Sequence, residues 1–140
     1  SRDFTAGAHP YLVTPRHTAE ARAILGGGKL LMPEQGVVLE TDPAKARDLA
    51  RQALDHYRYL PNYRNNWKRL GFSEEEIDGL SDGLIDALFG WGTPEQIAAR
   101  VQEHLDAGAD HVCMQVISGP TGGDLNEVRR KYRVLAEALL

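Results

Sequence analysis

The sequence predicts an α/β fold in which parallel strands alternate with helices and form the C-terminal half of a (β/α)8 TIM barrel. Short apolar runs alternate with segments that carry apolar residues at helical spacing, which is typical of a parallel sheet with crossover helices. The strand segments are apolar on both faces, as expected for strands covered on both sides. Only three or four strands are visible in 140 residues, whereas a closed barrel has eight strands and typically about 250 residues. We therefore expect a single domain over residues 1–140 that corresponds to half of a barrel.

The composition is that of an ordinary globular domain and excludes several classes of partner. Hydrophobic residues make up 42% of the chain, charged residues 26%, and the net charge is −4. The chain has no basic surplus for nucleic acid and no polybasic run for a membrane surface. No apolar run approaches the roughly 20 residues that span a bilayer, and the N-terminal residues lack a signal-peptide pattern. The single cysteine, Cys113, can form no internal disulfide and has no partners for a metal cluster, so we expect a cytoplasmic protein without a metal site.

Helix-start signals follow each of the first two predicted strands. Thr14 with Pro15, and Asp42 with Pro43, each place a capping side chain before a proline at the first helical position. Three glycines, 26–28, end the first of these helices. The expected elements are strand 8–13, helix 15–25, strand 35–41 and a helix from 43 to about 60.

A helical insertion is expected over residues 61–88. Ser73 and Glu76 form a capping box that opens one short helix, and 81–88 predicts another. Segment 61–72 is aromatic and basic, which favours a subunit interface or a substrate lid over a nucleic-acid surface. The alternative is a solvated helix face with aromatic residues in the core.

The C-terminal part contains the clearest helix–strand unit, over residues 90–117. Thr93 and Pro94 start a helix whose apolar residues recur at 3.6-residue spacing, and Gly108 ends it. The other elements expected here are a short strand at 89–91, a strand at 111–117, and a final helix from Asp124 or Asn126 to Leu140.

Three segments in this order resemble the luciferase-like monooxygenase superfamily and, within it, the coenzyme F420-dependent oxidoreductases. They are 7–15 with 17–18, 37–43 with 46–47, and 92–116. Residues 60–63 and 70–72 are similar to the helical insertion of the same subgroup. The resemblance covers nearly the whole chain but corresponds only to the C-terminal half of the family's barrel.

The resemblance implies a (β/α)8 barrel that holds coenzyme F420, or alternatively FMN, at its C-terminal mouth. Such enzymes transfer a hydride between the deazaflavin and an organic substrate, or activate oxygen on a reduced flavin. We therefore expect a small-molecule substrate. Whether this chain alone is an enzyme stays open, because the family's N-terminal strands supply much of the cofactor and substrate pocket.

A second hypothesis belongs to a different class of protein. The chain would be a non-catalytic α/β fragment that self-associates or pairs with a missing N-terminal half. Half of a barrel leaves two sheet edges and apolar strand faces uncovered. Under either hypothesis we expect a homo-oligomer or a domain-swapped dimer.

Candidate site residues lie near the C-terminal ends of the predicted strands, which carry the active site in a parallel barrel. His9 is expected to be catalytic or to donate to a cofactor oxygen, and Tyr11 to stack or hydrogen-bond near the cofactor ring. Glu40 ends the second strand and is the other catalytic candidate. The alternatives are a polar residue at the rim for His9, and a salt bridge or helix-start anion for Glu40.

Two further candidates come from the last strand and the loop after it. Gln115 is expected to contact the flavin edge from the barrel interior, whereas Cys113 is expected to be a small buried hydrophobic residue. The glycine-rich loop 118–124 contains Gly122 and precedes the last helix. We expect it either to contact phosphate or to close the site.

Overall fold

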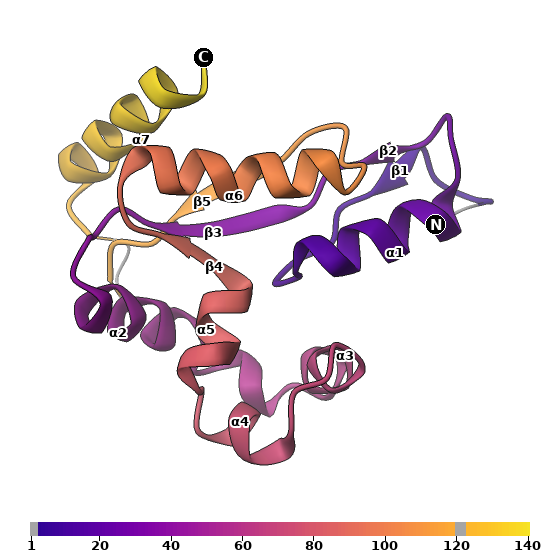
Figure 1. Cartoon of the computed structure of the whole chain (residues 1–140), viewed down its shortest axis with the longest axis horizontal. Helices are drawn as coiled ribbons and strands as arrows, with labels where there is room; N and C mark the ends of the chain where they lie inside the picture. Colours follow the sequence, from indigo (N-terminus) through magenta and orange to yellow (C-terminus); the bar gives the residue numbers. More distant parts are fainter. Residues whose placement is uncertain (1–2, 120–122) are drawn as a thin grey trace.

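Helices lie on both sides of a small parallel sheet in the computed structural model, which describes residues 3–119 and 123–140 (Figure 1). The strands are β1 (Gly7–Ala8), β2 (Leu30–Leu31), β3 (Glu34–Val38), β4 (Phe89–Trp91) and β5 (Cys113–Val116). The helices are α1 (Pro15–Leu25), α2 (Pro43–Leu54), the 3-10 helix η1 (Tyr57–Tyr59), α3 (Pro61–Arg69), α4 (Glu74–Asp78), α5 (Asp82–Leu88), α6 (Pro94–Asp106) and α7 (Leu125–Leu139). The α/β class predicted from the sequence is confirmed.

One extended segment, 30–38, is the partner of every other described strand. Its even-numbered residues bond to residues 6–10 and then to the β4 side, as in the bond from the Glu34 amide to the Pro10 carbonyl (2.8 Å). Its odd-numbered residues bond to the β5 side, as in the bond from the Ile117 amide to the Val37 carbonyl (2.8 Å). All pairings are parallel, and the three-stranded sheet has the order β4-β3-β5. Strand β4 therefore lies across β3 from β5.

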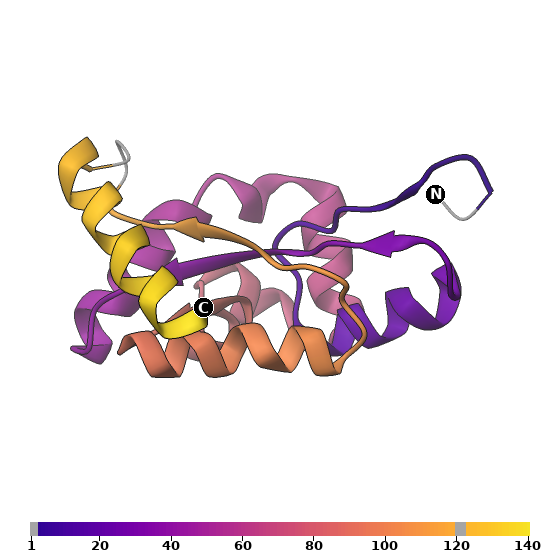
Figure 2. The same cartoon turned by 90° about the horizontal axis from the view of Figure 1, so that it is seen from above.

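Both faces of β3 are covered, and all five of its residues are buried. Val37 packs against Ile97 of α6 and Leu135 of α7. Val38 belongs to a larger cluster on the opposite face, formed by the helices α2 to α5. Figure 2 shows α7 lying beside the first part of α6. The prediction of a buried parallel strand is confirmed at β3, whereas the half-barrel arrangement stays a prediction.

The helix-start signals lie where the sequence predicts them. The hydroxyl of Thr14 accepts from the His17 amide (3.2 Å), and the carboxylate of Asp42 accepts from the Ala44 amide (2.9 Å). Capping boxes open α4 at Ser73 and α6 at Thr93. The final helix is capped by Asp124, which settles the choice that the sequence left between Asp124 and Asn126.

Two boundaries differ most from the prediction. The expected strand 8–13 ends at Ala8, because Pro10 has no N–H to continue the ladder, although its carbonyl still accepts from the Glu34 amide. The backbone then turns at Leu12, whose φ is +52°. The indole N–H of Trp67 donates to the Leu12 carbonyl (3.3 Å) and stabilises this turn. The expected helix 43–60 ends at Leu54 and is followed by η1, since Pro61 disfavours helical backbone at the residue before it.

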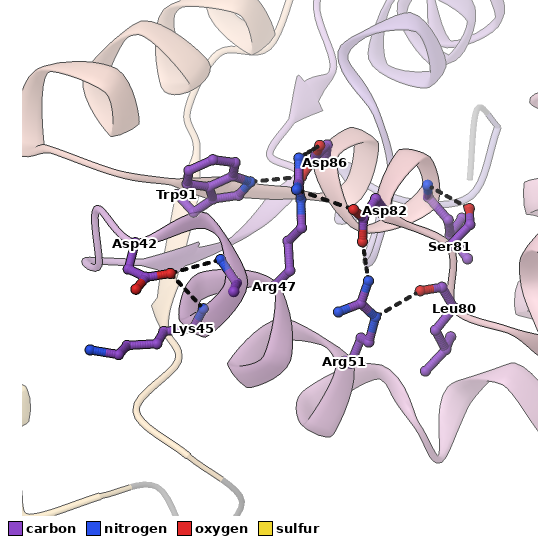
Figure 3. Close-up of polar contacts among 11 residues, drawn as sticks. Asp42, Lys45, Arg47, Arg51, Leu80, Ser81, Asp82, Asp86 and Trp91 are labelled. Atoms are coloured by element: carbon purple, nitrogen blue, oxygen red, sulfur yellow. Dashed lines mark hydrogen bonds and ion pairs between the residues drawn. The ribbon is translucent and has the colours of Figure 1, made fainter.

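An ion-pair cluster joins α2 to α5 and β4 (Figure 3). The guanidinium of Arg47 donates to both carboxylate oxygens of Asp86 (3.0 and 2.6 Å) and lies 5.3 Å from the centre of the Trp91 ring. The Trp91 indole N–H donates to the same carboxylate (2.8 Å). The Arg47 hydrogen bonds lower the pKa of Asp86, so the pair stays ionised at neutral pH. A planar, bidentate donor is needed for this geometry.

We expect Arg47→Lys to lower the free energy of unfolding, because an ammonium group cannot donate to both carboxylate oxygens and stack on Trp91 at once. Urea denaturation at neutral pH measures the loss. Lys45→Arg, at an exposed position on the same helix, is the matched control and should leave the midpoint nearly unchanged. Equal midpoints for both variants and the wild type would contradict a stabilising role for this cluster.

A fully buried polar group links α1, β3 and α6. His104 Nε2 lies 2.9 Å from Gln35 Oε1, and its Nδ1 lies 2.9 Å from the Thr18 hydroxyl. The Gln35 amide nitrogen donates to the Leu88 carbonyl (2.9 Å), which leaves Oε1 as the acceptor for His104. His104 is therefore neutral, with its proton on Nε2, and burial lowers its pKa to about 4.

We expect the protein to lose stability as the pH falls from about 6.5 to about 4, because the unfolded state then binds a proton at position 104 and the folded state does not. The lost stability is about 3 kcal/mol for this group. His104→Gln should reduce this pH dependence in urea denaturation, whereas His111→Gln, at an exposed histidine, should retain it. An unchanged slope in His104→Gln would contradict the assignment.

Candidate functional site

A cavity of about 300 Å³ lies between the sheet and the chain segment from α2 to η1. Its walls come from β3, β4 and β5, from the turn before α1, and from α2 and η1. The lining residues are Tyr11, Leu12, Glu34, Gln52, Ala53, Tyr57, Phe89, Gln115, Val116, Ile117, Ser118 and Gly119. The cavity thus unites residues from these six parts of the chain and from residues 117–119 after β5, and it is the candidate functional site.

Gly36 allows the wall of this cavity to form. It is paired with Phe89 of β4, and a Cβ at position 36 would lie 2.7 Å from two carbons of the Phe89 ring. The absence of a side chain therefore lets the Phe89 ring lie against β3.

Glu34 is the one carboxylic acid that lines the cavity among the described residues. Glu34 is only 6% exposed, and neither of its carboxylate oxygens has a hydrogen-bond partner within residues 3–119 and 123–140. Burial raises the pKa of Glu34 to about 7, and the backbone of Leu12 opposes this shift. The group can therefore hold or release a proton near neutral pH, which suits a general acid or base.

Two tyrosines and an amide form a short hydrogen-bonded chain in the same cavity. The Tyr57 hydroxyl donates to the Tyr11 oxygen (3.4 Å), and the Tyr11 hydroxyl donates to Gln115 Oε1 (2.9 Å). Burial raises the pKa of Tyr11 well above its usual range, and the Tyr57 hydrogen bond and the Glu34 charge act in the same direction. Tyr11 is therefore a neutral hydroxyl that can donate or accept hydrogen bonds but does not ionise at neutral pH.

The local backbone explains why Tyr11 reaches the cavity. Leu12 adopts a left-handed conformation that a leucine rarely takes, and such strain persists only where the surrounding structure imposes it. Fully buried Trp67 holds the Leu12 carbonyl, and the Tyr57 ring packs edge-on against Tyr63 at 4.9 Å. The aromatic residues of the insertion thereby support the turn that carries Tyr11.

The structure brings together two of the predicted site residues. Tyr11 and Gln115, 104 positions apart in sequence, are hydrogen-bonded to each other in the cavity. The Gln115 residue is exposed, so a ligand can reach its side chain. Their predicted roles in cofactor binding remain predictions.

The other predicted site residues lie elsewhere. His9 is exposed and donates from Nδ1 to the Met32 carbonyl (2.5 Å), and Glu40 accepts from the Asp42 amide (2.9 Å) at the start of α2. Neither lines the cavity. Gly122 lies outside the described residues. Catalytic roles for His9 and Glu40 therefore remain predictions, with the rim and helix-start alternatives still in place.

Glu34 and Tyr57 were missed by sequence reasoning. Tyr57 falls in the apolar stripe of the helix expected from 43 to about 60 and resembles a core residue. One local feature of the sequence could have indicated Glu34 as a site residue. Its carboxylate directly precedes the buried stretch 35–38, which contains a strand glycine at position 36. Its lack of partners depends on residues far away in sequence.

The aromatic and basic segment is divided between core and surface. Tyr63 and Trp67 pack in the core cluster, whereas Arg64 pairs with Asp78 (2.5 Å) and with Glu74, which also pairs with Lys68. Acidic residues of α4 thus neutralise these cations. This arrangement matches the alternative of core aromatics on a solvated helix.

No group of three or more His, Cys, Asp or Glu side chains is placed to hold a metal ion within the described ranges. Among the helices of those same ranges, none has the length and apolar character needed to cross a membrane.

Comparisons with known proteins find a relation at the level of the fold. No protein-family model matches the sequence, and no curated protein matches it. A similar solved structure is an F420-dependent secondary alcohol dehydrogenase in complex with an F420-acetone adduct, with a TM-score of 0.63 and 13% sequence identity. The match covers 98% of this chain and 44% of the dehydrogenase, so this chain spans less than half the length of that neighbour. At this identity the likeness shows the fold alone.

We expect Glu34→Gln to stabilise the protein at about pH 8, because the buried acid has a raised pKa. Between pH 4.5 and about 7 the unfolded state loses a proton that the folded state keeps, so the wild type loses stability as the pH rises. The shift from 4.5 to about 7 corresponds to about 3 kcal/mol.

Urea denaturation over this pH range measures the effect. Glu137→Gln, at an exposed position on α7, is the control and should match the wild type. A Glu34→Gln variant that is less stable than the wild type at every pH would contradict the buried, unpartnered state of this carboxyl group.

Proposed function

We propose that this chain is the C-terminal part of a luciferase-like, F420-dependent oxidoreductase that transfers a hydride between the deazaflavin and a small organic substrate. The observation that carries the proposal is the cavity with an unpartnered, protonatable Glu34 beside the Tyr11–Gln115 hydrogen bond. The fold-level likeness to an F420-dependent dehydrogenase and the ordered motifs in the sequence support it. In a complete barrel of this class, the remaining strands would come from another polypeptide segment or a second copy.

The residues of the cavity fit an uncharged, ring-sized part of a ligand. A space of about 300 Å³ with two tyrosine hydroxyls and two side-chain amides offers hydrogen bonds and apolar contact. None of the described lining residues is Lys, Arg or His, so the cavity offers no counter-charge for phosphate. It would hold the ring of F420, or of FMN as the alternative, or the substrate, whereas anionic parts would bind elsewhere.

Each polar residue would have a separate task. The bound deazaflavin would accept or donate the hydride. Glu34 would hold the proton that accompanies a change between carbonyl and hydroxyl, since its pKa lies near 7. Tyr57 orients the Tyr11 hydroxyl, and Tyr11 in turn orients the Gln115 amide, whose N–H groups then face the ligand.

A non-catalytic fragment that self-associates is the second candidate, and exposed apolar side chains favour it. Ile24 is 71% exposed and Leu30 is 50% exposed, at the end of the molecule that carries β1 and β2. Pairing with a second copy or with a missing N-terminal half would bury them. Size-exclusion chromatography with light scattering tests this, because a monomer at high concentration would exclude self-association.

Titration with F420 and with FMN, followed by absorbance and fluorescence, tests the proposed function. We expect saturable binding of F420 that Gln115→Ala weakens about tenfold, since a lost ligand hydrogen bond corresponds to roughly 1.4 kcal/mol. Gln102→Ala, at an exposed glutamine of α6, is the matched control and should bind as the wild type does. Absence of binding by both cofactors would leave the non-catalytic candidate.

A further inference from the structure

The cavity contains an acid but no base to neutralise it. The other polar side chains that line the cavity are Tyr11 from the turn before α1, Gln52 from α2, Tyr57 from η1, Gln115 from β5 and Ser118 after it, and the Leu12 backbone acts on Glu34 as well. Burial raises the pKa of Tyr63 in α3 and the charge of Glu34 contributes to this shift, while β4 contributes the apolar Phe89 ring. None of these groups carries a positive charge. An ionised Glu34 would therefore be a buried charge without a cationic partner, favoured only by the Leu12 backbone amide, which is costly.

Protonation relieves this cost but leaves a hydroxyl donor unsatisfied. A protonated carboxyl has one O–H to donate, and neither Glu34 oxygen has a partner among the described residues. Two acceptors of the cavity already accept a hydrogen bond, since the Tyr11 oxygen accepts from Tyr57 and Gln115 Oε1 accepts from Tyr11. A ligand oxygen is thus the partner that this carboxyl group lacks.

We propose that the cavity binds an uncharged molecule whose carbonyl or hydroxyl oxygen accepts a hydrogen bond from protonated Glu34, and that Glu34 selects such ligands over anions. A carboxylate or phosphate in this cavity would meet an acid and two neutral tyrosines, with no cation among the described lining residues to offset its desolvation. Lys131, which donates to the lining Ser118 hydroxyl (3.1 Å), is already paired with Glu127 (2.8 Å). The inference rests on the proposed function for the identity of the cavity as the substrate site. Binding of a probe can be measured without cofactor, so the two can fail separately.

Acetophenone and benzoate form a matched pair of probes. They have nearly the same shape, but acetophenone is an uncharged hydrogen-bond acceptor and benzoate is an anion. Titrations of the whole chain by ¹H–¹⁵N NMR at about pH 6 and about pH 8 give both dissociation constants. We expect acetophenone to bind at least tenfold more tightly than benzoate at pH 6, and to bind about tenfold more weakly at pH 8.

The Glu34→Gln variant distinguishes the effect of the titrating proton from the effect of side-chain shape, because glutamine has nearly the same shape but does not titrate. Its amide N–H donates to acetophenone at any pH, so binding should persist and lose its dependence on pH. At pH 8 benzoate should bind more tightly to Glu34→Gln than to the wild type, because the repulsion from ionised Glu34 is gone. Glu137→Gln should reproduce the wild type in all four measurements.

A direct titration makes the outcome independent of any variant. The ¹³C shift of the Glu34 carboxyl group should give a midpoint near 7, and saturating acetophenone should move that midpoint upward because the ligand binds the protonated form. Equal affinity for the two probes, a midpoint that acetophenone leaves unchanged, or no binding of either probe would overturn the inference. If acetophenone binds as expected but neither F420 nor FMN binds, the result supports the inference and contradicts the proposed cofactor.

Discussion

The structure depends on the burial of one strand, β3, between two layers of helices. Because segment 30–38 bonds to residues 6–10 and β4 along one edge and to β5 along the other, it holds every described strand in register. Its alternating residues then meet different surroundings. Gln35 and Val37 face α6 and α7, whereas on the opposite face Glu34 borders the cavity and Val38 packs with the helices α2 to α5. The cavity forms on the second face, at the beginning of the strand, where the insertion does not fill the space.

Two segments enclose this strand surface as a cavity: the turn at Leu12, which the helical insertion supports, and the stretch from α2 to η1. Residues 6–10 run along the edge of segment 30–38 and then leave it at the Leu12 turn, and β4 occupies the edge beyond that point. Trp67 fixes the turn through the Leu12 carbonyl, and the η1 helix brings Tyr57 to Tyr11. A change in the insertion would therefore alter the polar groups of the cavity without touching the sheet.

Much of the fold could be predicted from the sequence because its signals are local. Caps at Thr14, Asp42 and Ser73 act on backbone groups two or three residues away, and the structure confirms all three. The early end of the first strand has a local cause in Pro10, whereas the turn at Leu12 could not be predicted, because it depends on Trp67, 55 positions away. The site was predictable only in part, because some of its properties depend on residues far apart in sequence. Tyr11 and Gln115 follow from their positions on the predicted strands. The lack of a hydrogen-bond partner for the Glu34 carboxyl group depends on which side chains the whole fold places around it.

Adjacent residues of β3 show why Glu34 is the functional candidate. Gln35 and Glu34 are both buried polar residues on one strand, and their side chains face opposite layers. Gln35 donates to the Leu88 carbonyl and lies within hydrogen-bond distance of His104, so its burial is compensated and contributes to packing. Glu34 has no such compensation and borders a cavity, so a fold without a ligand gains nothing from an acid there. The cost of burying this acid is therefore best explained by a partner that binds in the cavity and accepts its proton or its hydrogen bond.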